Sequence, residues 1–360
     1  YLIQQKIQHG PLRLIFTVDE ETNMTGALSL SADHVKDAKY VINCDSESIH
    51  VICVASAGSC HMEFTRDLHR CAPTGDTALT VRAHALAGGH SGEVINEGRG
   101  NAIKAVADVL YRLSEGGVEY ALADYKGGVA ANAIPSDASA VVVVAAKDVD
   151  RVKATVAAAE KDFNLVYGET DPNTVFEVAP ADLPKSVLSA EDTTSIVDVI
   201  NLLHCGVFAM DRRLPRLPAL SASLGTIETR EDVLAFQYFP RSSSDARLQA
   251  LVRVMPVMAK CTGTKVHIEK PFPAWTESKN SKLQALMADA YKDVMGKEPR
   301  VEAMHGGLET GFLYAMNPDL DIVSVGPETH DIHSADERVE LDTVAQLVQV
   351  IAGTLERLTK

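Results

Sequence analysis

Acidic and histidine side chains gather at three points of this sequence. Asp19, Glu20 and Glu21 are adjacent, Asp45 follows later, and His333 lies near the C-terminus beside a second histidine. Adjacent carboxylates repel one another unless a cation lies between them, so the first cluster suits a divalent metal. One carboxylate would then bind the metal while its neighbour acts as a general base on water.

Each cluster also has a simpler explanation. An acidic loop in solvent would account for residues 19–21, and a turn or helix cap would account for Asp45. Ser334 and Glu337 could form a helix capping box beside His333, and His330 could compete with His333 as a ligand. Glu, Asp and His are nevertheless the types of ligand that zinc accepts in catalytic sites, so the three clusters together favour a metal site.

Two further residues could act on an anionic group. His90 lies in the glycine-rich stretch Gly88–Gly92, where it is either a turn histidine or an electrophile that stabilises an oxyanion. Arg241 follows the strand predicted at Val233–Pro240 and would either pair with a surface acid or clamp a substrate carboxylate. The glycines of Gly306–Gly311 would let backbone approach a ligand, and we expect Gly307 to bind substrate.

The elements that would position these residues are apolar runs that read as strands. Leu12–Val18, Tyr40–Cys44 and Ile322–Val325 each end just before one of the three polar clusters. An amphipathic helix is predicted at Leu341–Leu358. Apolar strands that alternate with helices predict an α/β fold with a mostly parallel, doubly wound sheet, in which ligands bind at the carboxyl ends of the strands.

The middle of the chain predicts a different kind of domain, with helices beside antiparallel strands. We expect an inserted α+β lid or dimerisation domain at residues 60–268, and a catalytic domain at residues 1–59 and 269–360. Within the insertion, the predicted strands are Asp76–Leu86, Ser139–Ala146, Ala219–Thr229 and Val233–Pro240, and the predicted helices are Asn101–Leu113, Val149–Asp162 and Ala246–Cys261. A further helix is predicted at Ser281–Met295.

Composition narrows the function classes. The 360 residues carry a formal net charge of −15, which disfavours binding to nucleic acid. No run approaches the roughly 20 apolar residues of a membrane span. The six cysteines form no CxxC pair, and the first ten residues do not resemble a signal peptide, so we expect a cytoplasmic protein. The chain begins at Tyr1 within an apparent helix, from which we expect a truncated N-terminus.

Several short stretches occur in a specific order: His9–Leu12, Thr17–Thr22, Asn43–Glu47, Gly88–Gly92, Gly100–Ala102, Asn132–Pro135, His305–Glu309, Val323–Pro327 and His333–Glu337. In residue identity and in order along the chain, these stretches resemble the zinc dipeptidases typified by bacterial aminoacyl-histidine (Xaa-His) dipeptidase, a carnosinase-like family. The resemblance runs from Gln8 to the end of the chain and is weakest over Glu160–Leu217.

The resemblance implies a role for each matched residue. Glu20 matches the general base, Glu21 and His333 match ligands of one zinc, and Asp45 matches a ligand of the other. His90 matches the histidine that stabilises the oxyanion, often in the partner subunit's active site. The substrate residues are the lid positions Asn132 and Arg241, with Arg241 at the C-terminal carboxylate.

The resemblance also implies two zinc ions or other divalent metals, a homodimer formed through the lid, and substrates such as β-alanyl-histidine. The family's His-x-Asp motif and bridging aspartate have no match in these 360 residues. We therefore expect this chain by itself to be inactive or nearly so. The alternatives are a related di-zinc carboxypeptidase or deacylase, and a non-catalytic dimerising remnant.

Overall fold

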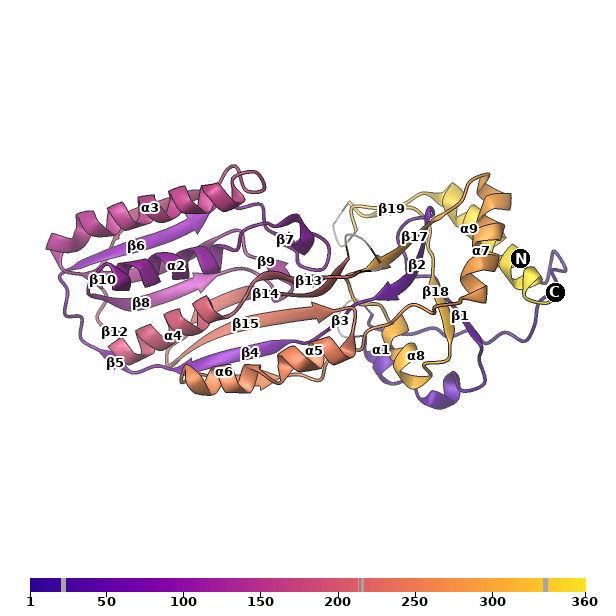
Figure 1. Cartoon of the computed structure of the whole chain (residues 1–360), viewed down its shortest axis with the longest axis horizontal. Helices are drawn as coiled ribbons and strands as arrows, with labels where there is room; N and C mark the ends of the chain where they lie inside the picture. Colours follow the sequence, from indigo (N-terminus) through magenta and orange to yellow (C-terminus); the bar gives the residue numbers. More distant parts are fainter. Residues whose placement is uncertain (21–23, 213, 215–216, 333–335) are drawn as a thin grey trace. The chain divides into compact units, whose positions relative to one another are not determined.

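A computed structural model describes residues 1–20, 24–212, 214, 217–332 and 336–360. The chain divides into two compact units (Figure 1). Unit 1 comprises Tyr1–Gly58 and Phe272–Lys360, and unit 2 comprises Ser59–Pro271. In the described part of the chain, no helix combines the length and the apolar character that crossing a membrane demands.

Unit 1 contains a four-stranded sheet. In spatial order its strands are β1 (Tyr40–Asn43), β18 (Asp321–Ser324), β2 (Val51–Ser56) and β17 (Arg300–Met304). β1 and β18 are parallel, β17 and β2 are also parallel, and β18 and β2 are antiparallel. The sheet is therefore mostly parallel, as the alternation of strands and helices predicts.

Helices cover both faces of this sheet. Successive side chains of a strand point to opposite faces, so Ile52 and Val54 enter one core cluster and Cys53 enters the other. The first cluster contains residues of α7 (Lys282–Met295) and α9 (Leu341–Arg357), and the second contains residues of α8 (Thr310–Met316). This arrangement is the doubly wound α/β architecture that the sequence predicts.

The predicted strand at Leu12–Val18 is wrong. The structure gives this segment no strand pairing, and its side chains are exposed: Leu14 by 77%, Phe16 by 89% and Val18 by 69%. An apolar run becomes a strand only where a neighbour supplies backbone hydrogen bonds and a core to cover. Among the described residues, Val18 accepts one amide, that of Gly26, but no strand pairs with the segment and no core covers its apolar side chains.

Unit 2 is built on an antiparallel sheet. Along the sheet its strands are β11 (Val175–Ala181), β6 (Thr77–His84), β10 (Ala138–Val144), β8 (Tyr120–Gly127), β14 (Pro218–Thr229), β15 (Val233–Ser242), β4 (Met62–Asp67) and β16 (Lys265–Ile268), with β13 (Gly206–Met210) beside β14. The helices are α2 (Ala102–Glu115), α3 (Val149–Tyr167), α4 (Ala190–Leu202), α5 (Asp245–Val252) and α6 (Met255–Cys261).

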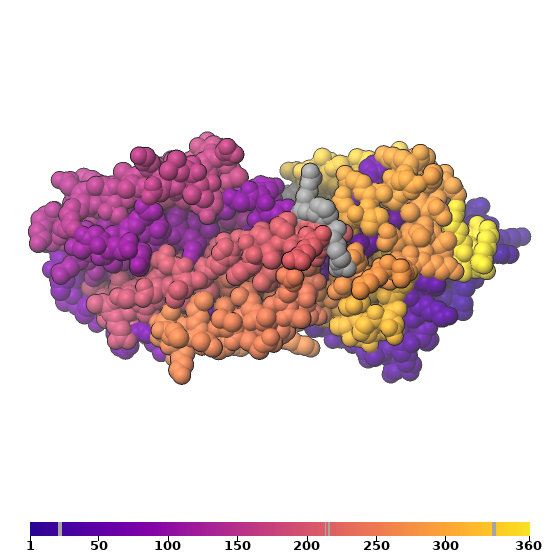
Figure 2. All heavy atoms as spheres, in the orientation of Figure 1, coloured from indigo at the N-terminus to yellow at the C-terminus, as the bar shows by residue number. Residues whose placement is uncertain are grey.

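These helices lie on one face of the sheet, and they share one apolar core with it. α3, α5 and α6 form part of the outer surface of the unit (Figure 2). The sequence predicts a single helix at Ala246–Cys261, but α5 ends at Val252 and α6 begins at Met255. Pro256 lacks a backbone N–H and its ring would clash with the carbonyl of Val252, so the helix breaks there.

Unit 2 contains the same topology twice. One half has the element order β-α-β-β-α-β and consists of β6, α2, β8, β10, α3 and β11. Its strands lie in the spatial order β11-β6-β10-β8. The other half consists of β4, α4, β14, β15, the helix pair α5 and α6, and β16. Its strands lie in the matching order β16-β4-β15-β14. Each half has the ferredoxin-like arrangement. The halves join where Gly127 and Lys126 of β8 pair with Ile227 and Glu228 of β14.

Candidate active site

In unit 1, Glu20 lies in a loop that is closed by backbone hydrogen bonds. The amide of Met24 donates to the carbonyl of Asp19 at 2.7 Å, and the amide of Gly26 donates to the carbonyl of Val18 at 3.0 Å. Asp19 has a left-handed backbone with φ of 60°, a conformation that Asp tolerates better than most residues. Glu20 is half-buried, and its neighbour Glu21 lies outside the described residues.

Gly307 follows β17 and lies near this loop. The amide of Ala57, just after β2, donates to the carbonyls of Met304 at 3.1 Å and Gly306 at 3.0 Å. A Cβ atom at Gly307 would lie 3.8 Å from the Ala57 carbonyl oxygen and 3.9 Å from the methyl carbon of Met24. The structure therefore brings Gly307 next to the segment that closes the Glu20 loop.

Asp45 is exposed and follows the carboxyl end of β1. Its amide donates to the Oδ1 atom of Asn43 at 3.2 Å, as in an Asx turn. The next amide, that of Ser46, donates to the carbonyl of Val325 at 3.2 Å. Gly326 is so close that a Cβ atom there would overlap the Ser46 carbonyl. Asp45 thus lies beside the chain that leaves β18.

Of the predicted metal ligands, Asp45 is described, whereas Glu21 and His333 lie outside the described residues. Within the described ranges, no three His, Cys, Asp or Glu side chains come together as a metal site. His330 Nε2 lies 2.8 Å from Glu340 Oε1, so this histidine is already engaged. The types of donor in Glu21, Asp45 and His333 suit zinc.

In unit 2, His90 and Arg241 are in contact. Arg241 Nη2 lies 3.3 Å from His90 Nε2, and Arg241 Nε donates to Ser91 Oγ at 3.5 Å. A guanidinium can only donate, so His90 Nε2 is the acceptor in this arrangement. His90 Nδ1 lies 3.4 Å from Glu93 Oε1. The sequence separates His90 from Arg241 by most of the unit, and the fold brings them together.

The glycines around His90 have structural causes. Gly89 has φ of 124°, a conformation that side chains rarely adopt, and it begins the short pairing of β7 (Gly89–His90) with β9 (Ala133–Ile134). A Cβ atom at Gly92 would lie 3.0 Å from His90 Cε1 and 3.4 Å from the guanidinium carbon of Arg241. Glycine at position 92 therefore leaves room for both side chains.

Arg241 is a buried cation, and it forms no ion pair with the residues that the structure describes. It is 5% exposed, and no carboxylate of the described residues lies within ion-pair distance of it. Burial lowers the pKa of its guanidinium to about 10, and the more distant charge of Glu93 opposes that shift. The guanidinium carbon also lies 4.8 Å from the centre of the Phe239 ring. At neutral pH the group keeps its charge and can accept an anion.

Asn132 lies next to His90. Its carbonyl accepts the amide of Ser91 at 2.8 Å, and its side chain is exposed. The loops that carry His90 and Asn132 border a hollow of about 980 Å³ on the helix-free face of unit 2. Among its lining residues are Gly88, Gly89, Ala130 and Ala133. Three predicted residues, His90, Asn132 and Arg241, are thus neighbours within unit 2.

Asp171 is a residue that the sequence analysis missed. It is 1% exposed, and each of its carboxylate oxygens accepts a backbone amide at 2.7 Å, from Ala87 and from Gly100. These amides mark the two ends of the loop that carries His90. Asp171 lies within Glu160–Leu217, where the family resemblance is weakest, and it precedes a proline, so no sequence pattern distinguishes it from a surface residue.

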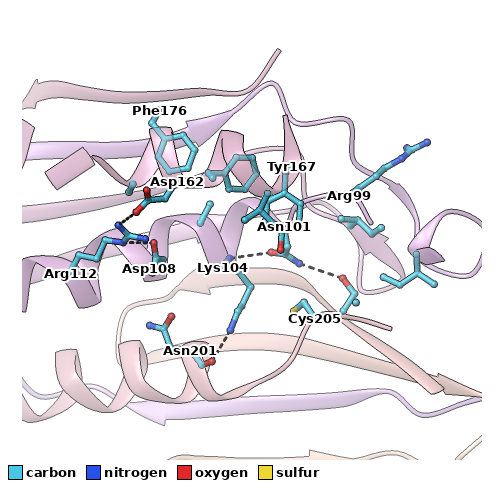
Figure 3. Close-up of a pocket in the computed structure, with 18 residues that line it drawn as sticks. Arg99, Asn101, Lys104, Asp108, Arg112, Asp162, Tyr167, Phe176, Asn201 and Cys205 are labelled. Carbon is cyan, nitrogen blue, oxygen red and sulfur yellow. Dashed lines mark hydrogen bonds and ion pairs between the residues drawn. The ribbon is translucent and has the colours of Figure 1, made fainter. Parts of the chain in front are cut away.

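A second cavity in unit 2, of about 300 Å³, lies between α2, α3 and the end of α4 (Figure 3). Its charged residues are satisfied from within the unit. Arg112 binds Asp108 and Asp162, each at 2.7 Å, and Lys104 Nζ donates to backbone carbonyls at the end of α4. Burial lowers the pKa of Lys104. This cavity therefore has little free charge to offer a ligand.

The fold is an α/β unit interrupted by an α+β unit, and the α+β unit holds a buried arginine in contact with the histidine of a glycine-rich loop. The model of peptidase family M20/M25/M40 matches residues 1–357. The chain therefore belongs to this family, and it is a hydrolase that acts on peptide bonds.

Known relatives agree with this assignment. The cytosol non-specific dipeptidase of Escherichia coli (strain K12) is 28% identical over 360 residues, which is 99% of this chain and 73% of the relative. The crystal structure of aminoacylhistidine dipeptidase from Vibrio alginolyticus matches with a TM-score of 0.90 and 28% identity, covering 98% of this chain and 72% of the other. A succinyl-diaminopimelate desuccinylase from Pseudoalteromonas atlantica is 29% identical over 130 residues, 35% of this chain and 33% of the relative.

Proposed function

We propose that this chain is a metal-dependent dipeptidase whose substrates are Xaa-His dipeptides such as β-alanyl-histidine. The contact between Arg241 and His90 carries the proposal. In a dipeptide, a single α-carbon separates the C-terminal carboxylate from the scissile amide. A group that binds the carboxylate must therefore lie close to the group that stabilises the oxyanion. Arg241 and His90, 3.3 Å apart, meet this requirement.

The reaction would use this chain's own residues in three roles. Arg241 binds the substrate carboxylate through its guanidinium. Glu20 accepts a proton from the attacking water at its carboxylate and passes it to the leaving amine. His90 donates a hydrogen bond to the oxygen of the tetrahedral intermediate. His90 Nε2 accepts from Arg241 in this structure, so a substrate carboxylate that draws Arg241 away would free Nε2 to take up a proton from water. The imidazolium would then donate from Nε2 to the oxyanion while Nδ1 faces Glu93.

Other residues would hold the metal and the rest of the substrate. Glu21 and His333 are the proposed ligands of one zinc ion, and Asp45 is a proposed ligand of the other. A bound divalent metal polarises the scissile carbonyl and lowers the pKa of water. Asn132 and the backbone at Gly307 would contact the peptide, Asn132 through its exposed amide.

The setting of the reaction is also a proposal. The name of the Escherichia coli relative supports a cytoplasmic location, and unit 2, the proposed lid, would form a homodimer. A two-metal site takes roughly six protein ligands, of which the matched residues supply three. We therefore propose that these 360 residues by themselves bind metal weakly and hydrolyse dipeptides slowly or not at all.

The partial match to a desuccinylase supports a second candidate, a deacylase of N-succinyl or N-acetyl amino acids. Such substrates also carry a carboxylate one carbon from the amide that is cleaved, so Arg241 would bind them in the same way. The two candidates differ in the acyl side, where a dipeptide presents an ammonium group and a succinyl group presents a second carboxylate.

A substrate panel tests the proposal. The protein as its source organism makes it, with its zinc content measured, is assayed with β-alanyl-histidine, other dipeptides, N-acetyl amino acids and N-succinyl amino acids. We expect dipeptides to be cleaved, with the Glu20→Gln variant about a hundredfold to ten-thousandfold slower in kcat. Cleavage of only the acyl substrates would favour the deacylase. No cleavage by protein that carries zinc would contradict both.

A further inference from the structure

Glu309 connects two segments of unit 1 that lie far apart in the sequence. It stands at the N-cap of α8, two residues after Gly307, and its Oε2 atom accepts a hydrogen bond from Thr17 Oγ1 at 2.7 Å. Its other oxygen, Oε1, is buried and has no hydrogen-bond partner among the residues that the structure describes. The pair is partly buried, so water competes weakly for the bond.

Thr17 stands at the base of the loop that carries Glu20. The next residue, Val18, accepts the amide of Gly26, and Asp19 accepts the amide of Met24. These bonds close the loop on itself and join it to α1 (Thr25–Leu28), whose Ala27 is fully buried. The bond from Thr17 to Glu309 adds a direct attachment to the start of α8, three residues before Glu20.

The other end of the attachment is well fixed. α8 begins directly after Glu309, and it buries Thr310, Phe312 and Leu313. Leu308 and Leu313 belong to the core cluster on this face of the sheet. The backbone of Glu309 therefore lies between a packed helix and the buried Leu308. A displacement of about 1 Å at a reacting group can cost a hundredfold in rate, so this attachment bears on catalysis.

We propose that Glu309 is a positioning residue that holds Glu20, through Thr17, where it can act as the general base. The inference rests on the proposed role of Glu20. It predicts that loss of the bond lowers kcat while the affinity for the dipeptide stays the same, because Arg241 and not the Glu20 loop binds the carboxylate. A bond that only stabilised the fold would leave both constants unchanged in the folded enzyme.

The test compares Thr17→Val, which removes the donor, with Thr17→Ser, which keeps it. Thr359→Val is the matched control, since Thr359 Oγ1 makes an exposed bond of 2.7 Å to the carbonyl of Glu356 near the C-terminus. Hydrogen exchange at the amides of Met24 and Gly26 reports on the loop, and kcat and KM for the best dipeptide report on catalysis.

For Thr17→Val we expect exchange at Gly26 to rise about tenfold and kcat to fall about tenfold to a hundredfold, with KM within about twofold. Thr17→Ser should recover most of both losses. Thr17→Val combined with Glu309→Ala should be no slower than Glu309→Ala alone, because both changes break the same bond. Thr359→Val should resemble the parent.

An unchanged kcat in Thr17→Val would overturn the inference, and so would equal losses in Thr17→Val and Thr17→Ser. If the parent enzyme with zinc bound cleaves no dipeptide, the proposed function fails, and exchange then decides the attachment of the loop by itself. Faster exchange at Gly26 in Thr17→Val and not in Thr17→Ser supports the attachment, and unchanged exchange refutes it.

Discussion

Arg241 combines two properties that rarely occur together, burial and the lack of a carboxylate partner among the described residues. A buried charge without a counterion destabilises the folded state, because the protein interior solvates it less well than water does. The lowered pKa of its guanidinium expresses the same cost. Arg241 therefore costs stability, and binding a carboxylate of the substrate is a reason for the protein to keep it.

Replacing Arg241 should therefore separate stability from function. In Arg241→Met we expect the KM for dipeptides to rise about a hundredfold, since the charge-assisted pair with the carboxylate is lost. The melting temperature should rise by about 2–4 °C, because the buried charge is gone. Steady-state kinetics and thermal denaturation measure the two effects.

Arg241→Lys is the matched control for that experiment. It keeps the charge but loses the two-pronged geometry, so KM should rise less and the melting temperature should not increase. A less stable Arg241→Met variant would show that the packing of Arg241 on Phe239 contributes more than the charge costs. An unchanged KM would place the carboxylate site elsewhere.

Gly92 offers a test of the geometry between His90 and Arg241. An alanine Cβ atom would lie 3.0 Å from His90 Cε1, which is closer than side chains normally approach. We expect Gly92→Ala to displace the imidazole and lower kcat about tenfold, with a small change in stability. Gly10→Ala, which meets nothing within 4 Å, is the control. Equal kcat values for the two variants would argue against His90 as the oxyanion donor.

Two sequence signals indicated these residues: glycine-rich and strand-end positions for His90 and Arg241, and the family resemblance for Asn132. They could not show that the three are neighbours, since that depends on pairing between β7 and β9 and on the position of β15. Asp171 has no sequence signal, and Glu309 is named only as the end of the stretch His305–Glu309, without a role. Each acts through one or two hydrogen bonds to distant backbone or side chains, and such bonds leave no periodic trace in the sequence.

Among the elements, helices were predicted best because their ends carry local signals. Ser281 caps α7 by accepting the amide of Gln284 at 2.8 Å, and Asn101 caps α2 by accepting the amide of Lys104 at 3.2 Å. Leu12–Val18 was misassigned because a strand depends on a neighbour, which the segment itself cannot reveal. The break between α5 and α6 could have been predicted from Pro256.

The loop between Ala87 and Gly100 is an element whose ends are held together by Asp171. Each carboxylate oxygen accepts one backbone amide. In asparagine one of these oxygens becomes an NH2 group, so a side-chain donor would face a backbone N–H donor and that hydrogen bond would be lost. We expect Asp171→Asn to lower the free energy of unfolding by about 1–3 kcal/mol. Hydrogen exchange at Ala87 and Gly100 should become faster, and kcat should fall as His90 loses its position.

Asp150→Asn is the control, because Asp150 is exposed in the first turn of α3. It should change neither exchange at Ala87 nor kcat. If Asp171→Asn slowed catalysis without faster exchange at either amide, the loop would be held by other contacts, such as the bond from Arg99 to the Gly88 carbonyl.

At the scale of the molecule, unit 2 shows a repetition that the sequence does not. Its two ferredoxin-like halves share strand order and helix placement, yet no repeat is visible in the residues. The fold requires that the apolar faces of the helices and of the sheet be buried against each other. Many different apolar residues can form such faces, so two halves with the same fold need not share a sequence. The second half also begins with β4, before the first half, so the two copies are interleaved along the chain.

The joining of β8 to β14 has a consequence for assembly. The edge strand β8 of one half and the edge strand β14 of the other cover each other within one chain, so neither edge is free to pair with a second copy. A homodimer formed by unit 2 must therefore use another surface. The end of α3 exposes Leu165 by 78% and Val166 by 72%, and the neighbouring edge strand β11 exposes Val175 by 42%. Exposed apolar side chains of this kind favour contact with a second copy.

We expect the protein to be a dimer in light scattering after size exclusion, and Leu165→Asp to make it a monomer, because a buried carboxylate without a partner is costly. Val254→Asp, at a 50% exposed position between α5 and α6, should remain dimeric. Residues 59–271 alone should fold and dimerise as well, since unit 2 contains its own core. A dimer that survives Leu165→Asp would place the interface elsewhere, and a monomeric parent would refute the proposed dimer.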